Sequence, residues 1–306
     1  MHRILVTGSR GLIGRALACR LEEMGHAVVR YDVSDDKSND IMNADRLKSA
    51  AASCSGIVHL AAVSRVTHGE RDPERCRLVN VDGTENVLAA AALPVRRRPW
   101  VIFASSREVY GESYSRPIPE SAPLRPMNVY AKSKVDAEKL VLSSREHAGL
   151  RASIVRFSNV YGSVFDHHDR VAPAFARKAA LGGILSVEGG NTILDFTHVD
   201  DVADGLVKMI ELTVDGEIVP TIHLASGQGT TLMELASLAV RIAGRGVINV
   251  TAPRQNDVSA FIGDPALART VLGWSSSTPL EEGMSRLVAS FASGARTALA
   301  PDMNAT

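Results

Sequence analysis

Short apolar runs that alternate with longer stretches of mixed polarity mark the pattern of hydrophobic and polar positions along this chain. The runs lack the alternation of a half-exposed strand, which is typical of strands buried on both faces of a parallel sheet. The stretches between them carry apolar residues at helical spacing, and strands that alternate with helices predict an α/β fold. The predicted strands are residues 4–6, 27–31, 56–60, 100–104, 152–157 and 222–225.

Breaking and capping residues give the limits of the helices between these strands. The first predicted helix ends at Met24, before Gly25, and a long helix begins near Asn128 and runs to Arg145. The others run from Asn80 to Leu93, from Val171 to Leu181, from Asp200 or Asp201 as a cap through Met209, and from Thr231 through Ile242.

The turn after the first predicted strand, from Thr7 to Gly14, has the sequence Thr-Gly-Ser-Arg-Gly-Leu-Ile-Gly. Gly8 permits a tight turn, Gly11 allows the backbone to approach a pyrophosphate, and Gly14 allows the helix to pack closely against the strand. The helix N-terminus then faces the phosphates. This order of strand, glycine turn and helix predicts a dinucleotide site, with Arg10, Leu12 and Ile13 as further cofactor contacts.

Asp32 ends the second predicted strand, where a carboxylate holds the ribose hydroxyls of the adenosine. A 2′-phosphate there would meet a like charge, which costs up to roughly 4 kcal/mol per charge pair at ~4 Å and an effective dielectric constant of ~20. The sequence therefore predicts NAD rather than NADP. The remaining cofactor candidates are Asp40, Ile41, Leu60, Ala61, Ala62 and Asn80, together with Tyr130 and Lys134. Asp40 could also be an ordinary acidic residue of a surface loop. His59, which precedes Leu60, could also be a histidine of the hydrophobic core.

A phenol and an ammonium group lie four positions apart, at Tyr130 and Lys134, on one face of the long predicted helix. A free tyrosine titrates near pH ~10, and a neighbouring lysine and a bound nicotinamide cation can each lower that pKa by roughly 1–3 units. Tyr130 is therefore a candidate general base that takes a hydroxyl proton while a hydride leaves the same carbon. Ser106, just beyond the strand 100–104, is placed to bind the same substrate group. The spacing alone also fits two helix-surface residues, and Ser106 also fits a strand-end cap.

Composition and charge narrow the function further. A length of 306 residues indicates one large domain or two. Lys and Arg total 34, as do Asp and Glu, and a formal net charge of zero argues against a sequence-independent nucleic-acid binder.

Since no apolar run approaches the ~20 residues that span a bilayer and no leader pattern precedes Ile4, we expect a soluble, cytoplasmic protein without a membrane partner. The adjacent His167 and His168 form no tetrahedral ligand set, so no metal is expected.

The order and spacing of five segments resemble the extended short-chain dehydrogenase/reductase superfamily, and more narrowly its NAD-dependent epimerase/dehydratase branch. These segments are Thr7–Gly14, Asp32, His59–Ala62, Ser105–Gly111 and the pair Tyr130 and Lys134. The resemblance covers nearly the whole chain. It implies a Rossmann-type doubly wound parallel sheet with a smaller, discontinuous C-terminal substrate domain, an NAD cofactor, a nucleotide-sugar substrate and a homodimer.

The resemblance also implies how the chain is divided and which residues bind substrate. It implies an NAD-binding domain over residues 1–165, to which roughly 192–228 return, and a mainly substrate-binding domain over 166–191 and 229–306. Asn159 and Arg254 match positions that contact the nucleotide diphosphate in the family. Ser106, Arg107 and Glu108 are the candidates on the sugar side.

Two departures from the family pattern bear on the reaction. The dehydratases carry an Asp-Glu pair after the Ser or Thr, but this chain has Arg107 and Glu108, and an arginine cannot protonate a leaving hydroxyl. Leu194 replaces an arginine that many relatives use for phosphate. Either Arg254, helped by Arg170 or Arg177, holds the diphosphate, or the substrate is not a typical nucleotide sugar. The leading hypothesis is a C4 epimerase of a nucleotide-linked hexose or uronate. A dehydrogenase or keto-reductase, a UDP-uronate decarboxylase, and a non-enzymatic NAD-binding sensor or scaffold remain as alternatives.

Overall fold

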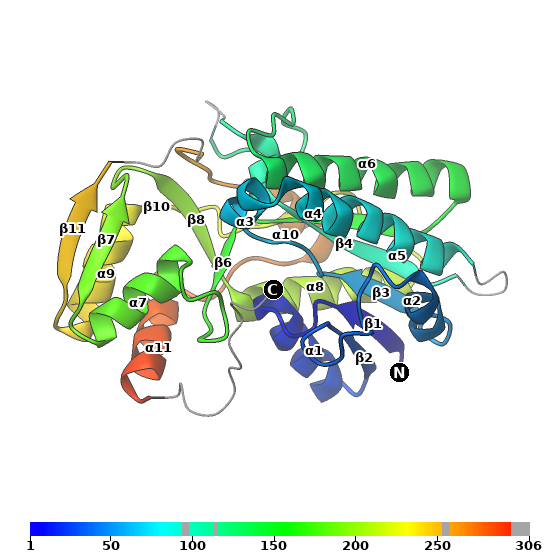
Figure 1. Ribbon diagram of the computed structural model, residues 1–306, viewed down its shortest axis with the longest axis horizontal. Helices are drawn as coiled ribbons and strands as arrows, with labels where there is room; N and C mark the ends of the chain where they lie inside the picture. Colours follow the sequence, from blue (N-terminus) through cyan, green and yellow to red (C-terminus); the bar gives the residue numbers. More distant parts are fainter. Residues whose placement is uncertain (94–97, 113–115, 253–257, 295–306) are drawn as a thin grey trace.

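The largest element of this computed structural model is a parallel β-sheet built from the short apolar runs of the sequence. Within the described residues, 1–93, 98–112, 116–252 and 258–294, it has six strands in the order β2-β1-β3-β4-β5-β9. They are β1 (Arg3–Thr7), β2 (Ala27–Tyr31), β3 (Gly56–His59), β4 (Trp100–Ser106), β5 (Ala152–Phe157) and β9 (Ile222–Leu224). Strands β1, β2 and β3 of this sheet lie at the right of Figure 1. Because β3 and β5 are buried along their whole length, their sequences lack the regular alternation of polar and apolar residues of a half-exposed strand.

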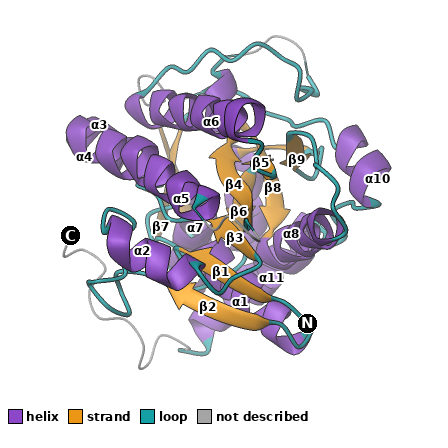
Figure 2. Cartoon of the chain, turned by 90° about the vertical axis from the view of Figure 1, so that its right-hand side faces the viewer, coloured by secondary structure: helices purple, strands orange, loops and turns teal. Residues whose placement is uncertain are grey.

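Helices cover both faces of this sheet (Figure 2). One face carries α1 (Leu12–Glu23), α8 (Val199–Val214) and α10 (Ala266–Leu272), and the other carries α2 (Ala44–Ala51), α5 (Gly83–Ala92) and α6 (Val129–Ala148). The sheet is therefore doubly wound, which confirms the predicted fold class. The strand order reverses between β1 and β3, and ligands of such sheets bind outside the carboxyl ends of the strands at that point.

A smaller group of elements has its own hydrophobic core, which includes Phe175, Leu235 and Leu287. It lies at the left of Figure 1, beside the carboxyl ends of the large sheet. One sheet joins β6 (Asn159–Tyr161), β8 (Ile193–His198) and β10 (Gly229–Thr231), and a parallel pair joins β7 (Ile184–Glu188) and β11 (Val247–Thr251). The helices are α7 (Val171–Ala180), α9 (Leu232–Ala243) and α11 (Leu280–Ala292).

The chain passes between the two parts more than once. It enters the smaller part after β5, returns to the large sheet at α8, and enters the smaller part again after β9. Two details refine the division drawn from the sequence. β8 pairs with β6 and β10 rather than with the large sheet, and α10 and Trp274 pack in the core of the large sheet although they fall within 229–306. The division into a cofactor part and a substrate part stays a proposal.

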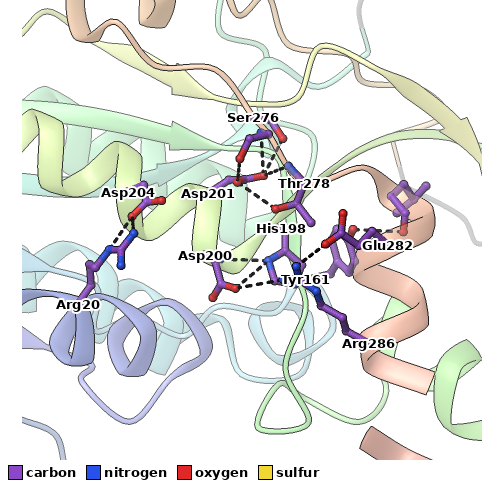
Figure 3. A network of polar contacts seen from close by, with 12 residues as sticks. Arg20, Tyr161, His198, Asp200, Asp201, Asp204, Ser276, Thr278, Glu282 and Arg286 are labelled. Atoms are coloured by element: carbon purple, nitrogen blue, oxygen red, sulfur yellow. Dashed lines mark hydrogen bonds and ion pairs between the residues drawn. The ribbon is translucent and has the colours of Figure 1, made fainter. Parts of the chain in front are cut away.

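Asp201 joins the two parts at the start of α8 (Figure 3). Its buried carboxylate accepts hydrogen bonds from Ser276 Oγ at 2.9 Å, Ser277 Oγ at 2.8 Å and Thr278 N at 2.9 Å, all on the segment that leads into α11. The expectation that Asp200 or Asp201 caps α8 was wrong, because Asp201 is engaged by this segment. His198 is the N-cap instead, since its Nδ1 accepts from Asp200 N at 3.3 Å.

Asn80 does not begin a helix, as the sequence suggested, but lies inside a continuous helical stretch. That stretch consists of α4 (Pro73–Arg77), a π-helical turn η1 (Leu78–Asp82) and α5. Asp72 caps it, because its carboxylate accepts from Arg75 N at 3.0 Å. π-turns often mark functional sites, and this one turns Asn80 toward helix α6. Among the described residues, no helix is long and apolar enough to cross a membrane.

Candidate active site

A cavity of about 580 Å³ lies between the two parts of the molecule. One wall consists of the glycine turn, the ends of β3 and β4, and the start of α6; the other consists of β6, α7, β7 and β8. This volume is typical of a small-molecule site. Of the predicted site residues, those on its wall are Gly8, Gly11, Leu12, Ile13, Gly14, Leu60, Ala62, Ser106, Arg107, Glu108, Tyr130, Lys134 and Asn159.

The glycine turn forms a cradle that side chains would fill. Gly8 has a φ of +67°, and a Cβ added there would come within 2.6 Å of Ala61 N. A Cβ at Gly14 would lie 2.2 Å from Gly8 O. Gly11 stands at the N-cap of α1 without a side chain to satisfy the first amide groups of the helix, which leaves them for an anion. The geometry of this turn fits the pyrophosphate of a dinucleotide.

Asp32 ties the glycine turn to the end of β2. Its carboxylate accepts from Arg10 N at 2.9 Å and from Ser34 N at 2.9 Å, and the Arg10 guanidinium pairs with Asp35. A carboxylate offers about four lone-pair sites, so Asp32 keeps capacity for ribose hydroxyls. Neither Arg10 nor Asp32 lies on the cavity wall, and their contact with the adenosine stays a prediction.

Three other cofactor candidates, Ala61, Ile41 and Asp40, do not line the cavity either. Ala61 donates its amide to Thr7 Oγ1 at 3.2 Å, and Ile41 is buried. The Asp40 carboxylate accepts from the amide of Met42 at 2.9 Å.

Asn80 is almost fully buried and its side-chain amide is fully engaged inside the protein. Oδ1 accepts from Val63 N at 2.8 Å, and Nδ2 donates to Val63 O at 3.1 Å and to Ser133 Oγ at 2.9 Å. Asn80 thus joins the segment after β3 to helix α6, one residue before Lys134. In this arrangement it holds one wall of the cavity in place, and its contact with the cofactor stays a prediction.

Tyr130, Lys134 and Ser106 meet where β4 ends and α6 begins. α6 starts as predicted, because Asn128 Oδ1 accepts from Ala131 N at 2.8 Å and caps the helix. Tyr130 and Lys134 are 8% and 4% exposed, and the hydroxyl of Tyr130 is hydrogen-bonded to Ser106. Lys134 Nζ donates to Ala104 O at 2.8 Å, and this hydrogen bond holds the ammonium group at the cavity wall.

The electrostatics of this trio differ from the expectation. Burial raises the pKa of Tyr130 to about 12, while the hydrogen bond with Ser106 and the positive charge of Arg170 lower it. Burial also lowers the pKa of Lys134 to about 8. The expected help from Lys134 is therefore weaker than the cost of burying the phenolate. Bringing the pKa of Tyr130 from about 12 to about 7 takes roughly 7 kcal/mol, to which the positive charge of a bound nicotinamide would contribute.

The substrate-side candidates fall into three groups. Arg107 Nη2 pairs with Glu108 Oε1 at 2.7 Å, and both residues line the cavity. Asn159 lines it too, and its buried Oδ1 has no hydrogen-bond partner among the described residues. Arg254 lies outside the described residues. Leu194 packs in the smaller core, as an apolar side chain at that position should.

Several wall residues were not identified from the sequence. Arg65 pairs through both terminal nitrogens with Asp169, at 2.7 and 2.8 Å, and Lys178 reaches the cavity from α7. Arg170 also lines the cavity, whereas Arg177, the other arginine considered for the diphosphate, does not. Arg65 and Lys178 carry no motif, and only the packing of the loop 163–170 against the segment after β3 brings Arg65 to the cavity.

Comparisons with known proteins agree with this geometry. The model of the "NAD dependent epimerase/dehydratase family" matches residues 4–222. The chain is 30% identical to the UDP-glucose 4-epimerase of Mycolicibacterium smegmatis over 94% of this chain and 98% of that protein. It is 28% identical to UDP-glucuronic acid decarboxylase 1 of Danio rerio, over 94% of this chain and 72% of that protein.

Among solved structures, the UDP-glucose 4-epimerase of Brucella ovis in complex with NAD superposes with a TM-score of 0.87 at 28% identity, covering 95% of this chain and 99% of that chain. The predicted resemblance is thereby confirmed. With a family model that matches well over half of its residues and a fold that matches along its length, this chain belongs to the NAD-dependent epimerase/dehydratase family.

Proposed function

We propose that this protein is an NAD-dependent epimerase that inverts C4 of a nucleotide-activated sugar through a transient keto intermediate. The observation that carries the proposal is the meeting of Tyr130, Ser106 and Lys134 beside the glycine cradle, with Arg107 where a dehydratase would carry an acid. Epimerisation needs no proton donor to a leaving group, so Arg107 is no obstacle to it.

Each side chain has a distinct task in this reaction. NAD, held by the glycine cradle, would supply the reversible hydride acceptor of this reaction. The phenolate of Tyr130 takes the proton of the C4 hydroxyl as the C4–H bond breaks, which leaves a ketone. Ser106 donates a hydrogen bond to the developing carbonyl oxygen, and Lys134 holds positive charge beneath the phenolate. When the ketone is reduced again on its opposite face, Tyr130 would give the proton back to the C4 oxygen.

The closing experiment measures cofactor and product together. The purified protein should contain NAD and should interconvert UDP-glucose with UDP-galactose, or UDP-glucuronate with UDP-galacturonate, without accumulating NADH. Steady accumulation of NADH would contradict epimerisation and favour the dehydrogenase. Retained NAD without any turnover would favour the sensor or scaffold.

A UDP-uronate decarboxylase is the second candidate, because Glu108 lines the cavity beside Ser106 and a relative carries that activity. Release of CO₂ from UDP-glucuronate would identify it. The homodimer and the cytoplasmic location also stay proposals, and the first can be measured by sedimentation of the NAD-loaded protein.

A further inference from the structure

Arg107 lies in the part of the cavity where the proposed reaction on the sugar would take place, beside Ser106 and Tyr130. It follows Ser106 directly, at the start of the 3₁₀ turn η2 (Arg107–Tyr110), and shares the cavity wall with Ser106 and Tyr130. Its side chain is 13% exposed, and its guanidinium lies over the ring of Phe261 at 5.9 Å from the ring centroid. The positive charge of Arg107 therefore lies close to the sugar of the proposed substrate rather than to its nucleotide.

The guanidinium of Arg107 is only partly satisfied. Nη2 binds Glu108, but the buried Nη1 has no hydrogen-bond partner among the described residues. Glu108 is occupied on both sides, because its other oxygen accepts from Asn128 Nδ2 at 3.2 Å. Buried donors without partners are costly, and an arginine fork suits a carboxylate because it donates two parallel hydrogen bonds.

The acidic side chains near Arg107 are each paired with an arginine, so they repel an anionic ligand only weakly. Asp169 is bound by Arg65 through two hydrogen bonds, and Asp166 lies 3.6 Å from Arg170 Nε. Glu108 is paired with Arg107 itself. With these three carboxylates each facing an arginine, a further carboxylate on the substrate meets little uncompensated negative charge from them.

We propose that Arg107 binds a carboxylate of the sugar, so that the preferred substrate is a nucleotide-linked uronic acid rather than a neutral hexose. This inference rests on the proposed function and names its substrate class. In the bound state the unpaired Nη1 would donate to the carboxylate while Nη2 keeps Glu108. A neutral hydroxymethyl group would offer a weaker hydrogen bond at the same place.

The test compares kcat/KM for UDP-glucuronate and UDP-glucose in the NAD-loaded wild-type protein and in Arg107→Gln, Arg107→Lys and Arg75→Gln. Arg75 is exposed on α4, away from the cavity, and serves as the matched control. We expect the wild type to prefer the uronate at least about tenfold. Arg107→Gln should lower kcat/KM for the uronate about tenfold more than for the hexose, Arg107→Lys should lie between the two, and Arg75→Gln should change neither.

The outcomes separate this inference from the function on which it rests. Wild-type protein that epimerises UDP-glucose as well as UDP-glucuronate would overturn the inference and leave the epimerase in place. Equal losses on both sugars in Arg107→Gln would do the same, because they indicate a general rather than a carboxylate-specific role. Turnover of neither sugar by NAD-loaded protein would overturn both. Even if a variant fails to fold, a wild-type ratio near one overturns the inference.

Discussion

At the scale of single residues, burial affects the pKa of the Tyr130 phenol more than the neighbouring lysine does. Burial raises the pKa of Tyr130 to about 12, and Lys134 is held by the carbonyl of Ala104. Sequence spacing identified Ser106, Tyr130 and Lys134, and all three line one cavity. It could not reveal that Arg170 lowers the pKa of Tyr130 or that the amide of Asn80 is already engaged, because both depend on segments distant in the chain.

Replacing Tyr130 with Phe should lower kcat about 10²- to 10⁴-fold, since the variant loses its general base. Bound NAD, measured after denaturation, should stay close to the wild-type amount because the glycine cradle is untouched. The wild-type rate should rise with pH between 6 and 9, since the deprotonated phenol is the active form and the pKa of Tyr130 lies high. Tyr31→Phe, which loses one hydrogen bond to Asp40 O, is the matched control and should stay within about threefold of wild type.

At the scale of elements, caps and turns were predictable where one local motif decides them. Asn128 caps α6, and Thr231 forms a reciprocal capping box with Glu234 at the start of α9. The cap of α8 and the π-turn η1 were missed for a shared reason. Asp201 binds a segment 75 residues further along the chain, and the π-turn carries Asn80, whose amide donates to Ser133 Oγ 53 residues away. Local patterns carry no trace of such partners.

Asp201→Asn should lower the free energy of unfolding by about 1–3 kcal/mol, because an amide cannot accept all the hydrogen bonds from residues 276–278. Asp204→Asn on the same helix is the control: its pair with Arg20 is on the surface, so it should cost less than about 1 kcal/mol. Thermal unfolding of both variants measures the difference. Equal losses would show that the Asp201 network does not join the two parts.

The pH dependence of that difference has a definite sign. Burial alone would raise the pKa of Asp201, but the hydrogen bonds from Thr278, Ser277 and Ser276 outweigh it and leave the pKa below its usual value. A carboxyl group whose folded pKa is lowered stabilises the protein above its unfolded pKa of about 4. The gap between wild type and Asp201→Asn should therefore be constant above pH 5 and should narrow as the pH falls below about 4.

At the scale of the whole molecule, the cavity belongs to both parts at once. The cofactor wall comes from the large sheet, and the opposite wall comes from the smaller part. The resemblance to a known family, and not a local pattern, led to the expectation of two parts with a chain that returns between them. It did not predict that α10 packs on the large sheet, since a short amphipathic helix carries no indication of its partner.

A ligand that touches both walls should stabilise the entire fold. At a concentration of about 100 times Kd, a nucleotide sugar should add about 2.7 kcal/mol to the free energy of unfolding and raise Tm by a few degrees. Differential scanning calorimetry with UDP-, GDP-, CDP- and dTDP-linked sugars measures this shift and identifies the nucleotide. Free glucose is the control and should leave Tm unchanged; a melt in two steps, with only one step shifted, would mean that the two parts unfold independently.

The repeated passage of the chain between its two parts also limits how the protein can be recombined. Transplanting the smaller part onto a relative would require exchanging three separate stretches, approximately residues 159–198, 229–251 and 280–292, while keeping α8 and α10 with the recipient. A single crossover anywhere within them would leave one wall of the cavity with foreign neighbours. New substrate ranges in this lineage should therefore arise through scattered point substitutions, such as those at the Arg107 position, rather than through block exchange.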